Sequence, residues 1–338
     1  MTRVLYFIIF VRCVLGFAQS QAGGQELPAI LVNSADRLAI VRLGRPAAEP
    51  AVTEGLKGRG RAVAFSPNQK VLLRCYDLPE VEDRPSGRIE AFRIGSDDSL
   101  EPLGQAATGG ATPCSMAVHP SGRFVAVAHF RAFGRNGGPG AESRGSVSIH
   151  PVGDDGVPRD AAQRMEYDGT SVHPTRQSNS HPHMVRFHPS GKWMLVADLG
   201  IDRIHVHRVI EATGEVQPAV HSVQAPPGTG PRHFVFHAAG RHFYVITEMS
   251  NEVLHYQFTP ETGEAQLKTR ITALTADGRG GAGADIVSDP AGRWLCASLR
   301  KNSLLALFSL DEANATPSRP SHLALRKEDT GAFWSGLL

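Results

Sequence analysis

A short turn motif recurs five times along the chain, and it restricts the fold more than any other feature of the sequence. Each copy opens with Ser, His or Asp, carries Pro in second place in four copies, and ends in Arg or Lys. The copies lie at residues 66–70, 119–123, 188–192, 237–241 and 289–293. They begin 53, 69, 49 and 52 residues apart, so apart from one insertion the repeat has about the length of a propeller blade.

The residues around each turn predict two paired antiparallel strands. A short apolar run precedes the turn, as at 116–118 and 234–236, and a run rich in aromatic and β-branched residues follows it, as at 193–196. A third stretch, such as 253–258, alternates apolar and polar residues, which indicates one packed face and one wet face. Repeated antiparallel units of this length predict an all-β propeller with blades around a central channel.

Composition agrees with a single closed domain of this kind. A chain of 338 residues can bury a large core, and 35 Gly with 23 Pro fit a turn-rich β fold. The net charge is only +2 and the Lys and Arg residues are scattered, so we expect no nucleic-acid partner. We expect a monomer.

The Cys and His patterns give little reason to expect a metal site. Cys13, Cys75, Cys114 and Cys296 show no paired spacing, and we interpret them as core thiols. His205 and His207 share one strand face, but no longer metal motif accompanies them. We therefore predict no metal and no cofactor.

The N-terminus resembles a secretory signal. A basic start is followed by an apolar run at residues 4–11 and by Ser20-Gln21-Ala22, a small-residue cleavage site. We predict a signal peptide over residues 1–22 and a propeller domain over 28–338, which implies a periplasmic or secreted protein with no membrane association after processing. The alternative is an upstream start ahead of a cytoplasmic enzyme.

The repeat also predicts where a functional site lies. In a propeller the innermost strand of each blade and the returning strand beside it meet at one end of the channel. Five residues before each turn the chain has Arg61, Cys114, His183, Arg232 and Ala284, and eleven residues after the first turn position it has Asp77, Phe130, Leu199, Glu248 and Arg300. The side chains differ from blade to blade although the flanking apolar runs are alike, as expected for a face that meets a ligand.

From these two columns we predict His183, Arg232 and Glu248 as catalytic residues and Arg300 as a substrate-binding residue. Asp285 and His233, each one position beyond the first column, are also predicted to bind substrate. An imidazole, guanidinium groups and carboxylates around one channel mouth suit an anionic substrate whose carbonyl must be polarised. Two structural alternatives remain open. His183 could be a loop residue bonded to backbone, and Arg232 could form only a structural salt bridge with Glu248.

Five ordered motifs resemble those of the seven-bladed β-propeller lactonase family, which includes propeller-type 6-phosphogluconolactonases and carboxy-cis,cis-muconate lactonizing enzymes. The motifs lie at residues 180–183, 198–203, 230–237, 247–251 and 284–286. The resemblance implies seven four-stranded antiparallel blades, places His183, Arg232 and Glu248 at the family's proposed catalytic positions, and makes Arg300 an additional anion-binding group. The chain departs from the family pattern at residues 280–283 and at His129-Phe130.

The C-terminal part of the chain is short for seven complete blades. Residues 314–338 contain no further turn motif, so we predict that the last blade is incomplete. An unclosed ring would leave open strand edges.

These features lead to one main hypothesis and two alternatives. The main hypothesis is hydrolysis of a sugar-acid lactone of the 6-phosphogluconolactone type, with His183 as general base, Arg232 stabilising the oxyanion and Arg300 holding a phosphate or carboxylate. No Gly-x-Ser-x-Gly elbow suggests a serine nucleophile. The alternatives are a lactonizing cyclase acting on a carboxymuconate-type diacid and a non-catalytic propeller that serves as a binding scaffold.

Overall fold

The computed structural model describes the backbone of residues 29–33, 38–42 and 51–53, and then residues 59–78, 87–96, 99–131 and 144–324. The predicted signal peptide, residues 1–22, lies outside these ranges, and so does most of the Gly- and Arg-rich stretch after Phe130. No helix among the described residues is long and apolar enough to cross a membrane.

The described strands form six antiparallel sheets that follow one another in chain order. The first sheet has three strands: β1 (Ala29–Asn33), β2 (Leu38–Arg42) and β3 (Ala51–Thr53). The next two have four strands each: β4 (Arg59–Phe65), β5 (Val71–Asp77), β6 (Gly87–Ile94) and β7 (Leu100–Ala107), then β8 (Ala111–Val118), β9 (Phe124–Arg131), β10 (Ser146–Pro151) and β11 (Gln163–Glu166).

The last three sheets also have four strands. They are β12 (Pro182–Phe187), β13 (Trp193–Asp198), β14 (Arg203–Ile210) and β15 (Glu215–Gln224); β16 (Pro231–Phe236), β17 (His242–Thr247), β18 (Glu252–Thr259) and β19 (Glu264–Thr272); and β20 (Gly283–Ser288), β21 (Trp294–Leu299), β22 (Leu304–Ser309) and β23 (Ser321–Ala324). A short 3₁₀ turn, η1 (Lys301–Ser303), joins β21 to β22.

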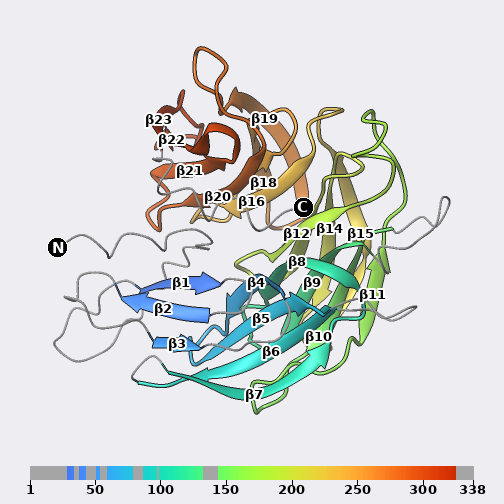
Figure 1. Ribbon diagram of the computed structural model, residues 1–338. Coiled ribbons are helices and arrows are strands. Elements are labelled where there is room, and N and C mark those ends of the chain that lie inside the picture. The colour runs from blue at the N-terminus through green and yellow to red at the C-terminus, as the bar shows by residue number, and fades with distance from the viewer. Residues whose placement is uncertain are drawn as a thin grey trace, which may run out of the picture.

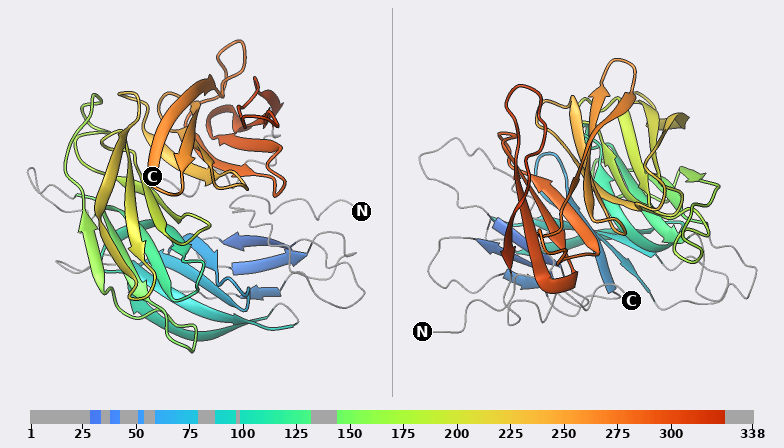
Figure 2. Two further views of the ribbon diagram at one scale, coloured as in Figure 1. Left: turned by 180° about the vertical axis from the view of Figure 1, so that it is seen from behind. Right: turned by 90° about the horizontal axis from the view of Figure 1, so that it is seen from above.

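The sheets succeed one another around the molecule, from the blue sheet β1–β3 to the red sheet β20–β23 (Figures 1 and 2). Their first strands lie toward the centre, where β4, β8, β12, β16 and β20 contact one another in sequence. This arrangement confirms the predicted all-β propeller of four-stranded antiparallel blades. Within the described residues there are five four-stranded sheets and one three-stranded sheet.

The recurring turn motif connects neighbouring blades through hydrogen bonds. The Nε2 atoms of His119, His188 and His237 donate hydrogen bonds to the carbonyl oxygens of Gly191, Gly240 and Gly292, each in the turn of the next blade, at 2.9, 2.9 and 3.1 Å. These glycines have positive φ angles, and a Cβ on Gly240 would lie 2.8 Å from His188 Nε2. The His and Gly of the motif therefore join blades rather than take part in chemistry.

The core lies between blades, where the faces of adjacent sheets interlock. One buried cluster joins β9 and β10 to β12 and β13, and a second joins β12–β14 to β16–β18. In the second, Phe243 stacks on Tyr256 with ring centroids 4.8 Å apart, and both side chains are fully buried. Because each blade is packed on both sides, the inner strands are held firmly around the channel.

Several histidines are buried as neutral rings, and they should make the fold sensitive to acid. Burial, assisted by nearby cations, lowers the pKa of His129 and His205 to about 3 and that of His255 to about 4, from an ordinary value of 6.5. The unfolded chain therefore binds these protons near pH 6.5, while the folded protein binds them only near pH 3 to 4. They cost the folded protein no stability above pH 6.5, and below that pH they lower the free energy of unfolding until the pH reaches their folded pKa values.

We expect each of these histidines to lower the free energy of unfolding by about 1.4 kcal/mol for each pH unit below 6.5. Urea unfolding at pH 7, 6 and 5 measures the loss, and replacing His205 with asparagine should make the dependence shallower. A free energy of unfolding that stayed constant between pH 7 and 5 would contradict this prediction.

Candidate active site

The functional column predicted from the repeat coincides with a β-bulge in every described four-stranded blade. The pairing of the first two strands shifts register around Arg61 in β4, Cys114 in β8, His183 in β12, Arg232 in β16, and Ala284 and Asp285 in β20. A bulge inserts a residue that leaves the regular alternation and turns its side chain away from the blade. The same local irregularity therefore recurs around the ring and presents a different side chain from each blade.

The two columns meet across the first two strands of a blade, as predicted. Arg61 Nη2 lies 2.6 Å from Asp77 Oδ2 in the β4–β5 pair, and Arg232 Nε donates to Glu248 Oε2 at 3.0 Å at the end of the β16–β17 pair. The salt bridge considered as a structural alternative for Arg232 is therefore present. It also forms part of a larger cluster.

Glu248 is the centre of that cluster and binds three guanidinium groups. Oε1 accepts from Arg176 Nε at 2.8 Å, and Oε2 accepts from Arg232 Nε and from Arg300 Nη2 at 2.9 Å. Burial alone raises the pKa of Glu248, but the charges of Arg232, Arg176 and Arg300 outweigh it and lower the pKa below 4.5. The cluster thus keeps one permanent anion and a net positive charge.

Arg232 is held on several sides at the channel mouth. Its side chain is 5 % exposed, and burial together with the charge of Arg300 lowers its pKa to about 10, so it stays protonated at neutral pH. Nη1 donates to Ala284 O at 2.5 Å and to His233 Nε2 at 3.3 Å. Nη2 is the nitrogen of this guanidinium for which the described residues supply no hydrogen-bond acceptor.

His233 and Asp285 were predicted as substrate-binding residues. His233 contacts Arg232, and Asp285 contacts His233. His233 Nδ1 donates to Asp285 Oδ1 at 2.8 Å, which leaves Nε2 as an acceptor facing Arg232. Asp285 is itself fixed, because its Oδ1 accepts from the backbone N–H of Ile286 and its own N–H donates to Ser298 Oγ. The contacts within the protein therefore give these two residues a positioning role.

His183 is buried in the channel as a neutral imidazole. Only 3 % of the residue is exposed, and its Nδ1 has no hydrogen-bond partner. Burial, then the charges of Arg232, His233 and Arg176, lower its pKa well below 6.5. Its ring packs edge-on against His233 at 5.1 Å between centroids and against Phe130 at 5.9 Å. The absence of a hydrogen-bond partner at Nδ1 gives no support to the backbone-bonded structural alternative for His183.

Two buried aspartates from the second family motif fix the loops ahead of His183 and Arg232. Asp198 accepts hydrogen bonds from Ser180 Oγ and the backbone N–H groups of His181 and Gly200, and burial raises its pKa to about 6. Asp202 accepts from the backbone N–H groups of Gly228 and Gly230. These bonds set where the bulged strands β12 and β16 begin.

Arg176 is the site residue that the sequence did not predict. It lies in the connection between β11 and β12, where its guanidinium covers the Phe130 ring at 5.0 Å from the centroid as well as binding Glu248. Phe130 also stacks on His181 at 4.2 Å. This connection, residues 167–181, is longer than the corresponding connections at 108–110, 225–230 and 273–282, so counting from the turns cannot find Arg176. The 69-residue spacing shows only that an insertion exists.

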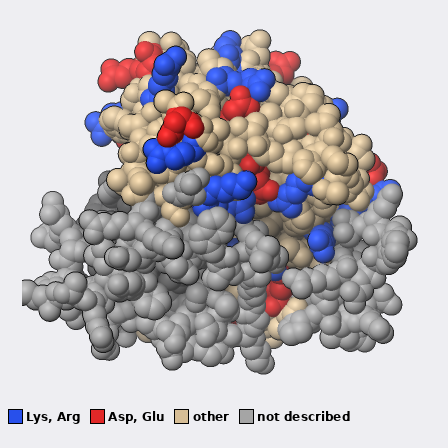
Figure 3. All heavy atoms as spheres, turned by 45° about the horizontal axis from the view of Figure 1, so that its top comes forward, with Lys and Arg blue, Asp and Glu red and all other residues tan. Residues whose placement is uncertain are grey.

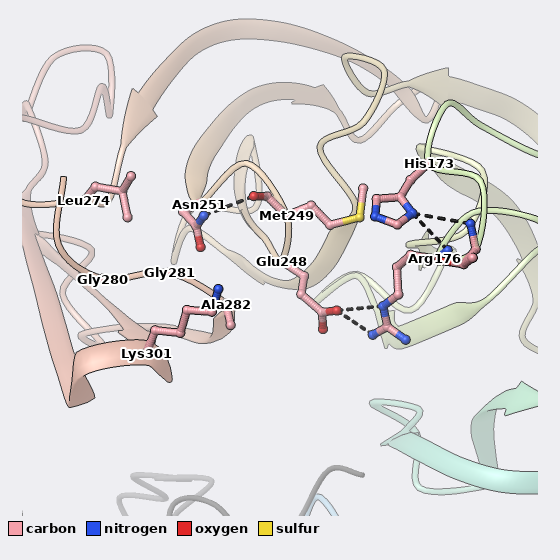
Figure 4. Close-up of a pocket in the computed structure, with 11 residues that line it drawn as sticks. His173, Arg176, Glu248, Met249, Asn251, Leu274, Gly280, Gly281, Ala282 and Lys301 are labelled. Atoms are coloured by element: carbon pink, nitrogen blue, oxygen red, sulfur yellow. Dashed lines mark hydrogen bonds and ion pairs between the residues drawn. The ribbon is translucent and has the colours of Figure 1, made fainter.

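A cavity of about 400 Å³ opens beside the cluster and reaches it at Glu248 and Arg176 (Figure 4). Its other lining residues are His173, Thr175, Met249, Asn251, Leu274, Gly280, Gly281, Ala282 and Lys301. Residues 280–282, where the sequence departs from the family pattern, therefore form one wall. The volume is in the range of pockets that hold small molecules.

The described residues contain no group of three or more His, Cys, Asp or Glu side chains able to hold a metal ion. His205 and His207 instead bond to Ser222 Oγ and to the Tyr167 hydroxyl. Cys75 is buried, and Cys114 and Cys296 are partly buried. On the described part of the face in Figure 3, Lys and Arg side chains are interspersed with Asp and Glu rather than gathered in one broad patch.

Comparison with known proteins matches the chain to a family model described as "Lactonase, 7-bladed beta-propeller" over residues 59–327. A 6-phosphogluconolactonase of Bacillus subtilis is 26 % identical over 75 % of this chain and 68 % of its own, and one of Formosa agariphila is 28 % identical over 74 % and 67 %. The structure of the periplasmic gluconolactonase of Pseudomonas aeruginosa superposes with a TM-score of 0.71 at 24 % identity, covering 88 % of this chain and 82 % of that one. The superposition supports the fold, and the family model covers most of the sequence. The chain thus belongs to the family of seven-bladed β-propeller lactonases, as its motifs predicted.

Proposed function

We propose that this protein hydrolyses the lactone of a sugar acid, and that His183 and Arg232, which both contact His233, act on the lactone carbonyl. The observation that carries the proposal is a buried neutral imidazole, with an unpartnered nitrogen, in the same cluster as a fixed guanidinium that retains an unused donor. The relatives named 6-phosphogluconolactonase support the predicted enzyme class and make 6-phosphoglucono-δ-lactone the first substrate to test.

In the proposed reaction His183 accepts a proton from water as the water oxygen attacks the lactone carbonyl carbon. The low pKa of His183 keeps its nitrogen available as a base at neutral pH. The C–O bond to water forms first, and the ring C–O bond then breaks, with the proton returned from His183 to the ring oxygen. No atom beyond one water is consumed.

Arg232 is suited to stabilise the oxyanion that forms in this step. Its Nη2 is free to donate, while Glu248, Ala284 and His233 hold the remaining nitrogens in place. A donor fixed before the reaction stabilises a developing oxyanion by about 3 kcal/mol, because no reorganisation is needed. Glu248 acts as the fixed counter-ion that allows three arginines to share the site. Phosphate binding by Arg300, which already binds Glu248 and Ala282 O, stays a prediction.

A substrate panel tests the proposal. Purified protein is assayed with 6-phosphoglucono-δ-lactone, glucono-δ-lactone and a carboxymuconate, each corrected for the spontaneous reaction. Hydrolysis of a sugar-acid lactone well above the spontaneous rate is expected. Cyclisation of the carboxymuconate alone would identify a lactonizing enzyme, and no turnover of any substrate would favour a binding scaffold; both results would overturn the proposal.

The location of the enzyme bears on which lactone it meets. The apolar run at residues 4–11 supports export, and the structural neighbour from Pseudomonas aeruginosa is described as periplasmic. We propose that the mature protein is exported and begins after Ala22. The N-terminal sequence of the mature protein tests this, and a mature chain that retained residues 1–22 would contradict it.

A further inference from the structure

The cavity beside the catalytic cluster has a cation on each of two opposite sides. Figure 4 shows Arg176 on one side and Lys301 on the other, with Glu248 between them. The two cations differ in what they already bind. Arg176 shares the carboxylate of Glu248 with Arg232 and Arg300, whereas Lys301 has no ion pair with any described residue.

Lys301 is placed by a backbone arrangement that is fixed at several points. Its N–H donates to Gly281 O at 3.0 Å, and the N–H of the preceding Arg300 donates to Ala282 O at 3.2 Å. Asn251 Oδ1 accepts from the Gly283 N–H at 3.1 Å, which ties the same loop to the neighbouring blade. Residues 281–283 are therefore attached both to the β17–β18 connection, through Asn251, and to the residues that follow β21.

The glycines of this loop allow the lysine stem to lie close against the backbone. Gly280 and Gly281 have φ angles of 113° and 127°, a region that favours glycine. A Cβ on Gly281 would lie 3.3 Å from Lys301 Cδ, and one on Gly280 would lie 2.8 Å from Leu299 Cδ1. Gly281 thus lets the Lys301 stem pack on the loop beside the cavity, and Gly280 lets the same loop pack against Leu299.

The charge of the cavity favours an anionic ligand group at Lys301. The three guanidiniums and Lys301 outnumber the carboxylates of Glu248 and Asp285, so the pocket region stays positive. The cavity reaches the cluster at Glu248 and Arg176, and Glu248 binds Arg232, so a ligand in the cavity would lie beside the cluster. An ammonium at the far side, not neutralised by a described residue, is suited to bind a terminal phosphate or carboxylate as a point charge.

We propose that Lys301, supported by the loop at residues 280–282, is a specificity-determining residue that binds the phosphomonoester of a phosphorylated sugar-acid lactone. This inference rests on the proposed function and deepens it. It assigns the terminal anion to Lys301 rather than to Arg300, whose guanidinium is held by Glu248 and Ala282 O.

The test compares two substrates that differ only in the phosphate. The KM and kcat for 6-phosphoglucono-δ-lactone and for glucono-δ-lactone are measured for the wild type, Lys301→Gln and Lys301→Arg. The matched control is Lys192→Gln. Lys192 is an exposed lysine in the recurring turn between β12 and β13, in another blade than Lys301. Lys301→Gln should raise KM for the phosphorylated lactone about tenfold, the loss of about one charge-assisted contact, with kcat and the other substrate nearly unchanged. Lys301→Arg should restore much of the affinity, and Lys192→Gln should resemble the wild type.

Equal effects of Lys301→Gln on the two lactones, or no effect on either, would overturn the inference while leaving lactone hydrolysis intact. If the wild type hydrolysed neither lactone, the proposed function would fail, and titration calorimetry with 6-phosphogluconate and gluconate would still decide the subsite. Weaker binding of 6-phosphogluconate alone in Lys301→Gln supports the subsite, and unchanged binding rejects it.

Discussion

Replacing His183 with alanine is expected to lower kcat for lactone hydrolysis at least about a hundredfold, because the reaction loses its general base. Nδ1 of His183 has no hydrogen-bond partner within the described protein, so the variant loses few polar contacts. Thermal unfolding followed by circular dichroism should show that the fold persists. His183→Gln should be nearly as inactive, since an amide of similar size cannot accept the proton at neutral pH.

The neighbouring His181 provides the control. It lies in the same segment, but its Nδ1 donates to Phe130 O at 3.0 Å and its ring stacks on Phe130. His181→Ala should therefore disturb packing more than chemistry and reduce kcat much less than His183→Ala. Wild-type kcat in a folded His183→Ala protein would remove His183 from the mechanism.

Replacing Glu248 with glutamine is expected to reduce both stability and activity. The change preserves the shape of the side chain but leaves three guanidinium groups without their shared anion, and Arg232 among them is 5 % exposed. Breaking a buried ion pair in this way costs about 3 to 5 kcal/mol, because an uncompensated charge remains buried. Activity should also fall, since Arg232 loses the bond that orients its Nε edge.

Urea unfolding at pH 7 measures this cost, with Glu261→Gln as the matched control. Glu261 also binds an arginine, Arg241, but both side chains are 62 % exposed, and a pair of that kind contributes less than about 1 kcal/mol. Similar small losses in the two variants would show that the arginine cluster does not depend on Glu248.

The repeat predicted much of this architecture because one physical solution recurs in each blade. The turn histidines latch each blade to the next, and the residue five positions before each turn lies in a β-bulge that frees its side chain from the sheet. That regularity explains why counting along the chain found His183, Arg232 and Glu248 and the equivalent pair Arg61 and Asp77. The spacing from the turns therefore identified the residues that lie in the β-bulges, although the sequence itself does not show the bulges.

The remainder of the site depends on segments that the repeat does not govern. Arg176 comes from the long connection at residues 167–181, and it reaches Glu248 across a sequence separation of 72 residues. Lys301 is placed by the glycine loop and by η1, whose path depends on positive φ angles at residues 280–282. Arg300 binds Glu248, but this contact depends on how two neighbouring blades pack, which one sequence does not specify.

The proposed mechanism requires that the scissile carbonyl lies between His183 and Arg232. A crystal structure of the protein bound to 6-phosphogluconate, the product of the proposed reaction, tests that claim most directly. The carboxylate of the product should lie within hydrogen-bond distance of Arg232 Nη2 and next to the His183 ring. A carboxylate bound elsewhere on the propeller, with Arg232 and His183 both out of reach, would contradict the proposed site.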